Sequence, residues 1–459
     1  MSRPPGEPDH TAAPARRALV AACVGNAVEW YDFAIYGALG VLVTPVFFPS
    51  DDTATVLLAA FAVYATAFLV RPVGAVVFGV IADAQGRKPV LVAVVLLMSG
   101  ATAAIGVLPG YAAVGVLASC VVLLLRITQG LAAGGELGLA AVFITESAPA
   151  GRRGAFAAWH TATLAFGIAA GLTVGGLLHL LPPAQLEAGW WRIAFLIALP
   201  LGAVGFYLRR RVTESPVFLQ ASRGQGLEPR PVHLLWRDHR RAWLTGFAVI
   251  AAGSLAFNTF FIFLPNHLIA TTDLAPSAVL LVAVIGLLGG AASALLLGSL
   301  SDRVGRRPVV LTSLGALACG AVPVFALARS GSTGALLAAD LLGGVLVGGV
   351  LSVSLLAEMF PTAVRATGVA LTAGLASATM GGTAPFIDQV LFQMTDQALA
   401  PASYVAAVAL LAFGALWFWP ETAFGDLGDL GDLGELDQAS GVRHEPSDGR
   451  GKAAGASGS

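Results

Sequence analysis

Apolar residues in this chain come in long blocks that turns and charged clusters separate. Each block is roughly 20 to 28 residues long, so a helix rising about 1.5 Å per residue would cross a hydrocarbon layer of about 30 Å. Helices are expected because an open sheet cannot satisfy its backbone polar groups in lipid. The pattern predicts twelve membrane-spanning helices, at 18–44, 56–82, 89–108, 112–143, 155–180, 190–209, 242–265, 277–301, 308–328, 334–358, 366–392 and 402–419.

Composition supports a protein that is embedded in a membrane. Of the 459 residues, 56% are hydrophobic and 12% are charged, whereas soluble domains average about 25% charged residues. The charged residues are therefore too few to coat a water-facing surface of this size. All three cysteines lie inside apolar blocks and lack metal-ligand spacing. The net charge of -1 says little about partners. The chain is expected to bind no metal, no cofactor and no nucleic acid.

The positive charges indicate how the chain lies across the membrane. Lysine and arginine are concentrated in the segments that twelve spans would place on one side, whereas the other side has only Arg329 and the helix-end Arg192. The side rich in positive charge is normally cytoplasmic. We therefore expect cytoplasmic termini, an even number of spans and a multi-pass protein of the cell (plasma or inner) membrane.

Two motifs recur at equivalent places in the two halves of the chain. A Gly-x-x-x-Asp-x-x-Gly-Arg-Lys/Arg loop occupies 79–88 and again 298–307, and a Glu-x-x-Pro-x-x-x-Arg element occupies 146–153 and 358–365. Such repetition indicates two six-helix bundles related by duplication. The expected organisation is a cytoplasmic tail at 1–17, an N-terminal bundle at 18–209, a cytoplasmic linker at 210–241, a C-terminal bundle at 242–420 and a disordered cytoplasmic tail at 421–459.

Four charged residues fall inside apolar blocks at similar depth. They are Glu29 and Asp32 in the first span, Arg71 in the second and Arg126 in the fourth. A charge at the middle of a bilayer costs at least about 2.5 kcal/mol, so such residues are candidates for function. Glu29 and Asp32 are neighbours on one helical face, which Tyr36 continues. We expect a polar stripe that faces a central cavity; the alternative is a buried charge network that only fixes helix packing.

The sequence resembles the major facilitator superfamily and, more closely, its metabolite:proton symporters. The repeated Gly-x-x-x-Asp loops carry the first resemblance. The second rests on 25–37 (GNAVEWYDFAIYG), 71–74 (RPVG), 126–130 (RITQG), 134–136 (GGE), 189–192 (GWWR), 214–218 (ESPVF) and 420–422 (PET). The resemblance implies an all-α integral membrane protein with the major facilitator fold, about 12 transmembrane helices in two pseudo-symmetric six-helix bundles. Members carry dicarboxylates, shikimate, or proline and betaine, so the cargo stays open.

These features predict a secondary transporter and not an enzyme. No phosphate-binding loop, nucleophile elbow or dinucleotide fingerprint occurs in the required context. We expect proton-coupled uptake of a small carboxylate-bearing metabolite by alternating access, with the solute, the proton and the lipid bilayer as partners. One alternative cargo is a zwitterionic osmolyte such as proline or betaine. Another alternative is a drug or metabolite:proton antiporter, although Leu172 replaces the proline of the antiporter motif.

The expected mechanism uses opposing influences on buried carboxyl groups. Burial and a neighbouring carboxylate favour the protonated acid, whereas a nearby arginine favours the ionised one. Two adjacent acids could then share one proton as a coupled pair. Protonation would free an arginine to pair with a substrate carboxylate. The predicted proton-coupling residues are Asp32, Glu29 and Glu136, and the predicted substrate-binding residues are Arg71, Arg126, Asn26, Tyr36, Gln129, Asn258 and Asp388.

The repeated loops are expected to act as latches between the bundles. Asp83 and Asp302 end helices beside basic residues, and each acid can cap the N-terminus of a neighbouring helix, where the helix dipole favours negative charge. The resemblance implies that such contacts hold the cytoplasmic side closed. The predicted gate residues are Asp83, Arg87, Lys88, Asp302, Arg306, Arg307, Glu146, Arg153, Glu358 and Arg365. The alternative is that these residues only fix the topology.

Overall fold

The computed structural model consists of helices and their connections. It describes the backbone of residues 12–85, 87–134, 144–145, 148, 151–211, 231–361 and 364–424, and no strand occurs among them. The helices of the first half are α1 (Ala12–Ala38), α2 (Gly40–Phe47), α3 (Thr53–Leu69), α4 (Arg71–Gln85), α5 (Arg87–Val107), α6 (Tyr111–Val114), α7 (Val116–Gly134), α9 (Arg153–Leu178), α10 (Pro183–Glu187), α11 (Arg192–Leu196) and α12 (Ala198–Arg211). Those of the second half are α14 (Pro231–Asp238), α15 (Arg240–Asn258), η1 (Thr259–Phe263), α16 (Leu264–Thr271), α17 (Pro276–Val304), α18 (Arg306–Ala328), α19 (Thr333–Gly348), α20 (Val353–Glu358), α21 (Arg365–Ala376), η2 (Ser377–Gly382), α22 (Ala384–Thr395) and α23 (Ala400–Trp417).

Each of the twelve predicted spans coincides, as far as the described residues go, with one helix or with a short series of helices, and 135–143 of the fourth span lies outside them. Within the described residues, nine helices are long and apolar enough to cross a membrane, and a tenth results if the pair α1 and α2, bent by 73°, counts as one span. The smaller number has two local causes. For α5 the count considers only Val92–Val107, because the side chains at 82–88 and 91 lie outside the described part of the chain. The eleventh predicted span is divided among α21, η2 and α22.

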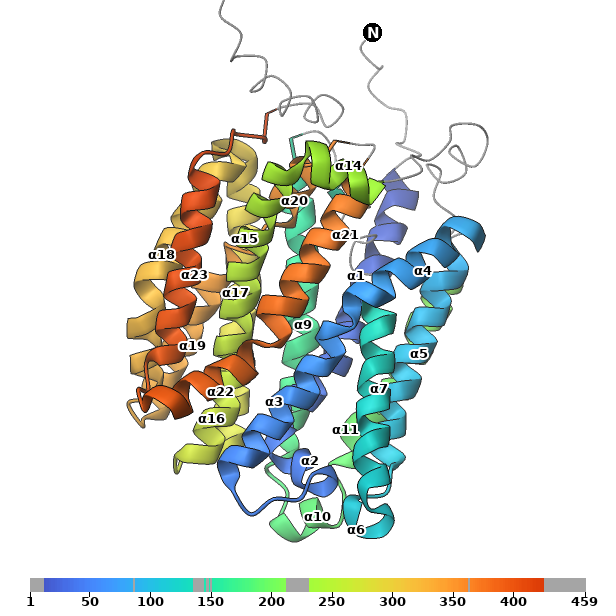
Figure 1. The fold of residues 1–459 in the computed structure, drawn as a ribbon, viewed down its shortest axis with the longest axis vertical. Coiled ribbons are helices and arrows are strands. Elements are labelled where there is room, and N and C mark those ends of the chain that lie inside the picture. The colour runs from blue at the N-terminus through green and yellow to red at the C-terminus, as the bar shows by residue number, and fades with distance from the viewer. Residues whose placement is uncertain are drawn as a thin grey trace, which may run out of the picture.

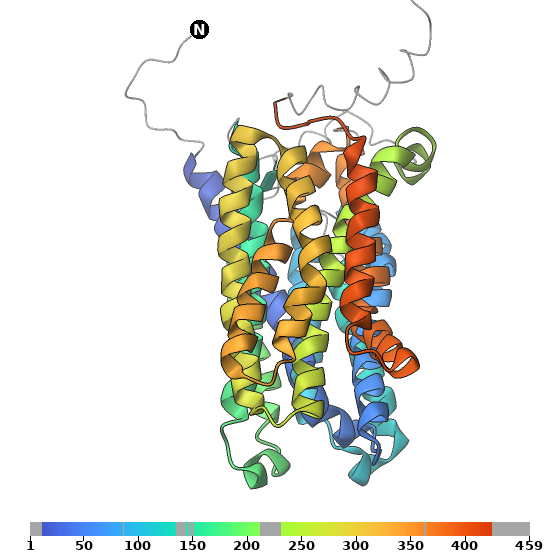
Figure 2. The same ribbon diagram turned by 90° about the vertical axis from the view of Figure 1, so that its left-hand side faces the viewer.

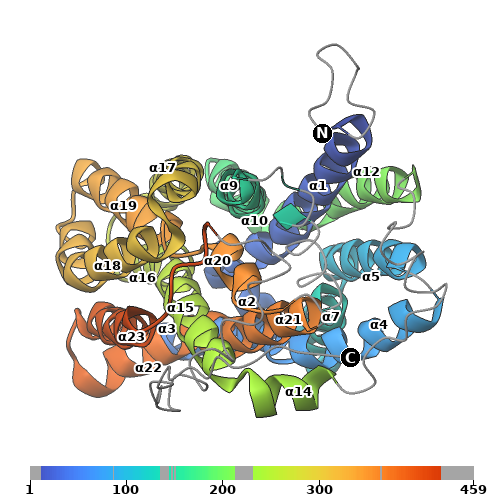
Figure 3. The same cartoon turned by 90° about the horizontal axis from the view of Figure 1, so that it is seen from above.

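The helices form two bundles that lie side by side. In Figure 1, α1, α4, α5 and α7 of the first half lie to the right, and α18, α19, α22 and α23 of the second half lie to the left. The view from above in Figure 3 places α9 and α17 next to each other where the bundles meet. Figure 2 shows that α1 begins and α23 finishes at the same end of the molecule, which we call the terminal end. An even number of spans requires this placement.

A helix break carries Arg71 into the interior of the first bundle. Helix α3 ends at Leu69 and α4 begins at Arg71, with Val70 between them. Pro72 supplies no backbone N–H and suits the first turn of a helix, so a new helix begins here instead of the old one continuing. The break leaves Arg71 with an exposed fraction of 1%.

Glycines bring α7 into direct backbone contact with α3 and α4. A Cβ atom added at Gly130 would lie 1.9 Å from the carbonyl oxygen of Ala67, and one added at Gly134 would lie 2.0 Å from that of Arg71. Cβ atoms essentially never come within 3.0 Å of another heavy atom. Gly130 and Gly134 therefore serve close packing, as small residues commonly do between helices in lipid.

We expect Gly130→Val to destabilise the fold by about 2 kcal/mol or more, because overpacking a close-packed interior costs about 1–3 kcal/mol and a backbone must move here. Gly100→Val is the matched control, since Gly100 also lies in a helix, α5, and nothing lies within 4 Å of its added Cβ. Thermal unfolding in detergent, followed by tryptophan fluorescence, compares the two variants. Equal midpoints would contradict the packing role.

Candidate functional site

Two buried arginines lie near the ring of Phe33 on α1, and two acids of that helix, Glu29 and Asp32, act electrostatically on them. The guanidinium carbon of Arg71 lies 4.2 Å from the centre of this ring, and that of Arg126 lies 5.7 Å from it. Glu29 and Asp32 lie on the same helix as Phe33. The exposed fractions are 5% for Glu29, 0% for Asp32, 1% for Arg71 and 0% for Arg126. The fold thus brings together the four charges that the sequence places at similar depth.

Arg71 is held among aromatic rings, and one of its nitrogens contacts the other bundle. Its guanidinium carbon lies 4.0 Å from the ring centre of Phe68 and 5.2 Å from that of Trp30. Its Nη1 donates to Ser377 Oγ over 3.4 Å. Its Nε and Nη2 have no hydrogen-bond partner among the described residues. These two nitrogens form one edge of the guanidinium, and such an edge receives a carboxylate through two parallel bonds.

Arg126 repeats this arrangement on α7. Its guanidinium carbon lies 4.3 Å from the ring centre of Tyr36 and 5.7 Å from that of Tyr64. Its Nη1 donates to Gln129 Oε1 over 2.8 Å, and Gln129 Nε2 donates in turn to Thr102 Oγ1 over 2.6 Å. Within the described part of the chain, its Nε and Nη2 also lack a hydrogen-bond partner. Each arginine is therefore anchored through Nη1 and presents its Nε–Nη2 edge unpaired.

The two acids of the cluster differ in their surroundings. Asp32 is fully buried, and neither of its oxygens accepts a hydrogen bond from a described residue. The hydroxyl of Thr102 lies beside Asp32 but donates to Met98 O over 3.0 Å. Glu29 acts electrostatically on Arg71. An ionised carboxylate without hydrogen bonds in a buried site is costly, and the nearby charge of Arg126 offsets part of this cost at Asp32.

The second bundle meets this cluster through two π-helical segments, η1 and η2. Such turns are rare in helices and are frequent at functional sites. Ser377, which accepts from Arg71, is the first residue of η2. Asn258 directly precedes η1, and its Oδ1 accepts from the hydroxyl of Tyr64 over 3.1 Å. Both contacts join the bundles near the charged cluster.

Two of the predicted substrate-binding residues make hydrogen bonds to residues other than the four charges. Asp388 on α22 is buried, and its Oδ2 accepts from the hydroxyl of Thr259 over 2.7 Å. Asn26 Nδ2 donates to His160 O over 3.1 Å and to Thr163 Oγ1 over 3.0 Å. Both of these acceptors belong to α9, so Asn26 joins two helices of the first bundle.

The residues that surround the arginines include several that sequence reasoning did not select. They are Trp30, Phe33, Tyr64, Phe68 and Ser377. A local signal exists for most of the rings, because two lie beside the acids of α1 and Phe68 lies one helical turn before Arg71. No local signal exists for Ser377, which is separated from Arg71 by 306 positions.

Asp302, near the end of α17, caps a helix of the other bundle. Its Oδ1 and Oδ2 accept from the backbone N–H groups of Gly154 and Ala155 over 2.8 and 2.9 Å, at the start of α9. The first amides of a helix lack internal partners and attract negative charge. Arg306 Nη2 lies 2.8 Å from Asp302 Oδ1. This cap joins the two bundles at the terminal end of the molecule.

Arg306 also connects the cap to the last turn of α20 and to the end of the chain described. Its Nη2 lies 3.3 Å from Glu358 Oε1, and Glu358 Oε2 accepts from the Thr422 hydroxyl over 2.8 Å. Glu421 accepts from the backbone N–H groups of Arg306 and Arg307 over 2.7 and 3.0 Å. Glu421 therefore caps α18. Neither Glu421 nor Thr422 is among the gate residues predicted from the sequence.

The remaining predicted gate and proton-coupling residues fall into two groups. Arg365 is buried, and its Nε donates to Ala357 O over 3.0 Å and to Phe360 O over 3.2 Å. Arg153 acts electrostatically on Glu358. Other residues, or their side chains, lie outside the described part of the chain, namely Asp83, Arg87, Lys88, Glu136 and Glu146.

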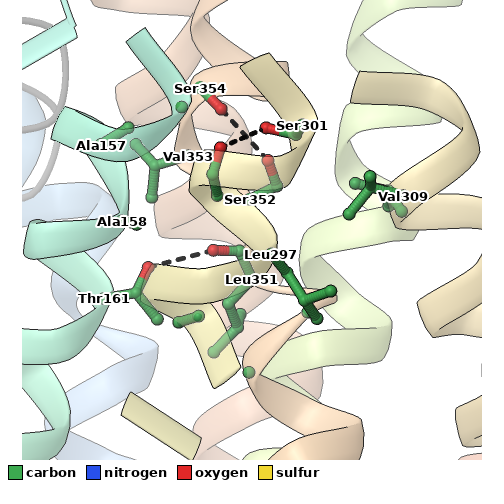
Figure 4. Close-up of a pocket in the computed structure, with 16 residues that line it drawn as sticks. Ala157, Ala158, Thr161, Leu297, Ser301, Val309, Leu351, Ser352, Val353 and Ser354 are labelled. Atoms are coloured by element: carbon green, nitrogen blue, oxygen red, sulfur yellow. Dashed lines mark hydrogen bonds between the residues drawn. The ribbon is translucent and has the colours of Figure 1, made fainter. Parts of the chain in front are cut away.

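A small pocket lies between the bundles, next to the Asp302 cap. Figure 4 shows that α9, α17 and the segment joining α19 to α20 supply its walls. The hydroxyl of Thr161 donates to Leu351 O over 3.0 Å, which joins the walls of the two bundles. Ser301, which accepts from Arg306, also lines the pocket. Because its walls belong to both bundles, the shape of the pocket depends on how the bundles sit against each other.

Comparison with known families finds one family that covers most of the chain. The profile of the sugar (and other) transporter family matches residues 18–230 and 221–430. The two matches together cover nearly all of the chain that the structure describes.

Similar proteins of known function include bacterial solute carriers. The chain is 36% identical over 400 residues to the alpha-ketoglutarate permease of Escherichia coli, covering 86% of this chain and 91% of the relative. It is 32% identical over 412 residues to the proline/betaine transporter of Salmonella typhimurium, covering 86% and 81%. It is 35% identical over 431 residues to the ectoine/proline transporter ProP of Corynebacterium glutamicum, covering 89% and 84%.

Solved structures confirm the predicted fold. The proton:xylose symporter XylE of the major facilitator superfamily, bound to 6-bromo-6-deoxy-D-glucose, matches with a TM-score of 0.75 at 18% identity, covering 92% of this chain and 100% of that one. An inward-open structure of XylE from E. coli matches with a TM-score of 0.68 at 19% identity, covering 91% and 99%. The chain therefore belongs to the sugar (and other) transporter family and has the major facilitator fold, which makes it a membrane transporter and not an enzyme.

Proposed function

We propose that the protein takes up a small carboxylate-bearing solute together with protons, across the cell membrane and by alternating access. The observation that carries the proposal is the pair of buried arginines, Arg71 and Arg126, each with an unpaired Nε–Nη2 edge. A solute carboxylate would form two charge-assisted bonds with such an edge. Because both guanidiniums lie near the same Phe33 ring, a dicarboxylate is the first candidate. The similarity to an alpha-ketoglutarate permease agrees with this choice.

Asp32 is the proposed carrier of the coupling proton. As a carboxylate it attracts Arg126 and competes with the solute for that guanidinium. As a neutral acid it leaves Arg126 to the solute. Proton binding and solute binding therefore favour each other, which is the coupling that a symporter needs. Glu29 has the same relation to Arg71 and would take part in the coupling.

Alternating access requires contacts between the bundles that break in turn. At the terminal end the Asp302 cap joins the bundles, and near the charged cluster Tyr64 donates to Asn258. At the opposite end, Asn266 Nδ2 donates to Gly37 O over 2.8 Å. Opening either end requires one of these sets to separate. We place the terminal end in the cytoplasm, because the arginine-rich loops lie there.

A zwitterionic osmolyte is the second candidate. The faces of Trp30, Phe33 and Phe68 surround the guanidinium of Arg71, and ring faces that hold a guanidinium can also hold a quaternary ammonium group. The similarity to transporters of proline, betaine and ectoine agrees with this candidate. Both candidates bear a carboxylate, so Arg126 would serve either of them.

We expect Arg126→Gln to reduce uptake roughly 10- to 100-fold, since a hydrogen bond to a charged group contributes about 1.5–3 kcal/mol. Uptake of radiolabelled α-ketoglutarate and glycine betaine into proteoliposomes measures the effect. Arg237→Gln is the control, because the Arg237 side chain is 74% exposed on α14. Unimpaired uptake of both solutes by Arg126→Gln would show that Arg126 does not bind the solute. The solute that the wild type prefers decides between the two candidates.

Asp32→Asn should abolish accumulation against a concentration gradient while leaving solute exchange partly intact, because an amide cannot take up or release the coupling proton. Uptake driven by an imposed pH gradient, compared with exchange at equal pH, separates the two activities. Asp273→Asn, in the loop between α16 and α17, is the control. Uphill uptake by Asp32→Asn at the wild-type level would refute this role.

Asp302→Asn should change the turnover rate several-fold and leave the preference between the two solutes unaltered. The substitution removes a charge that caps α9 and pairs with Arg306, and a cap of this kind contributes about 0.5–2 kcal/mol. Asp238→Asn is the control, because Asp238 on α14 pairs with the exposed Arg237 over 3.1 Å. An altered preference at unaltered turnover would contradict the latch.

A further inference from the structure

Asp388 is a buried acid that the proposed mechanism does not yet use. It lies on α22 with an exposed fraction of 0%, and its Oδ2 accepts from the Thr259 hydroxyl over 2.7 Å. Its Oδ1 has no hydrogen-bond partner among the described residues. With a single hydrogen bond and no exposure to water, an ionised carboxylate is costly here.

The titratable groups near Asp388 are Tyr404 on α23, on which Asp388 acts electrostatically, and His267 on α16. His267 contacts Gln389 and Phe392 of α22 and lies 2.9 Å from Arg329 Nη1.

A short path connects Asp388 to the interface between the bundles. Its partner Thr259 is the first residue of η1 and directly follows Asn258. The side chain of Asn258 accepts a hydrogen bond from the hydroxyl of Tyr64, which belongs to the other bundle. Any movement that separates the bundles here must break the bond to Tyr64, and it therefore acts on η1 and on the contact between Thr259 and Asp388. The acid is thus placed to stay dry while the bundles are joined and to meet water when they part.

We propose that Asp388 is a second proton-binding site, in the C-terminal bundle, which takes up and releases a proton once in each transport cycle. The proposal rests on the proton-coupled function proposed above for Asp32. While the bundles are joined, the Asp388 carboxyl group keeps its proton. When η1 moves, water reaches the group, the O–H bond breaks, and the proton leaves to water on the side that is open. Two protons would balance the two negative charges of a dicarboxylate, so the combined movement would carry no net charge.

The number of protons that enter with each solute tests the proposal. A pH-sensitive dye trapped in proteoliposomes counts the protons, and radiolabelled α-ketoglutarate counts the solute. We expect Asp388→Asn to halve the ratio of protons to solute, because the amide has similar size and cannot exchange a proton. An unchanged ratio in this variant overturns the proposal.

Asp340→Asn is the matched control for this measurement. Asp340 is also a buried acid of the second bundle, with an exposed fraction of 2%, but it lies on α19 where the backbone packs against Gly286 of α17. Both of these helices belong to the same bundle, so opening the interface should not expose Asp340. This variant is expected to keep the wild-type ratio, and a halved ratio here as well would overturn the assignment to Asp388.

A second measurement does not depend on transport. Infrared difference spectra of the purified full-length protein, recorded between acid and alkaline pH, detect the carbonyl band of a protonated carboxyl group. We expect a band that responds to pH and is lost in Asp388→Asn, and whose frequency shifts in Thr259→Val. A wild type that moves neither α-ketoglutarate nor glycine betaine with protons would reject the proposed function, and the spectra would still decide about Asp388. A band of Asp388 that does not respond to pH overturns the proposal.

Discussion

Two buried guanidinium groups impose the main constraint on this structure. A charge far from water is costly, and aromatic ring faces together with nearby acids lower that cost only in part, by about 2 kcal/mol for a desolvated ring contact. Each group makes one anchoring hydrogen bond through Nη1, which Arg71 donates to Ser377 Oγ and Arg126 donates to Gln129 Oε1. The remaining donors stay unpaired among the described residues. In the proposed function, the carboxylate of the solute would supply the missing partners of these donors.

Irregular backbone in this protein is concentrated where the bundles face each other. The break at Val70 positions Arg71, and η1 and η2 present Thr259 and Ser377. Backbone that departs from the α-helix is tolerated in a membrane only where protein or a water-filled cavity covers it. These departures therefore mark the part of each span that does not face lipid. Close glycine contacts occur inside a bundle, as at Gly130 against α3, and also between the bundles, where Gly154 of α9 packs against the backbone of Gly298 of α17.

The sequence predicts most of the fold and about half of the site. Long apolar blocks have few alternatives to helices in lipid, and the repeated motif placed Asp302 where a cap was expected. Sequence periodicity cannot show which distant helix a side chain meets. Asn26 is an example, because the sequence predicts that it binds substrate but cannot show that both of its hydrogen bonds go to α9. For the same reason Ser377 and Glu421 were not predicted, since each meets its partner only in the folded chain.

The cap that Glu421 supplies has a consequence for the far end of the chain. This residue follows the last transmembrane helix by only a few positions, yet it binds the first amides of α18, beside Arg306 and hence beside the contact with α9. The segment after α23 is thus connected, through α18 and Arg306, to the contact that joins the two bundles. Tension on the C-terminal segment, or a protein that grips it, would pull directly on that contact. A truncation that removes Glu421 would weaken the contact between the bundles. The segment after α23 therefore contributes to holding the bundles together.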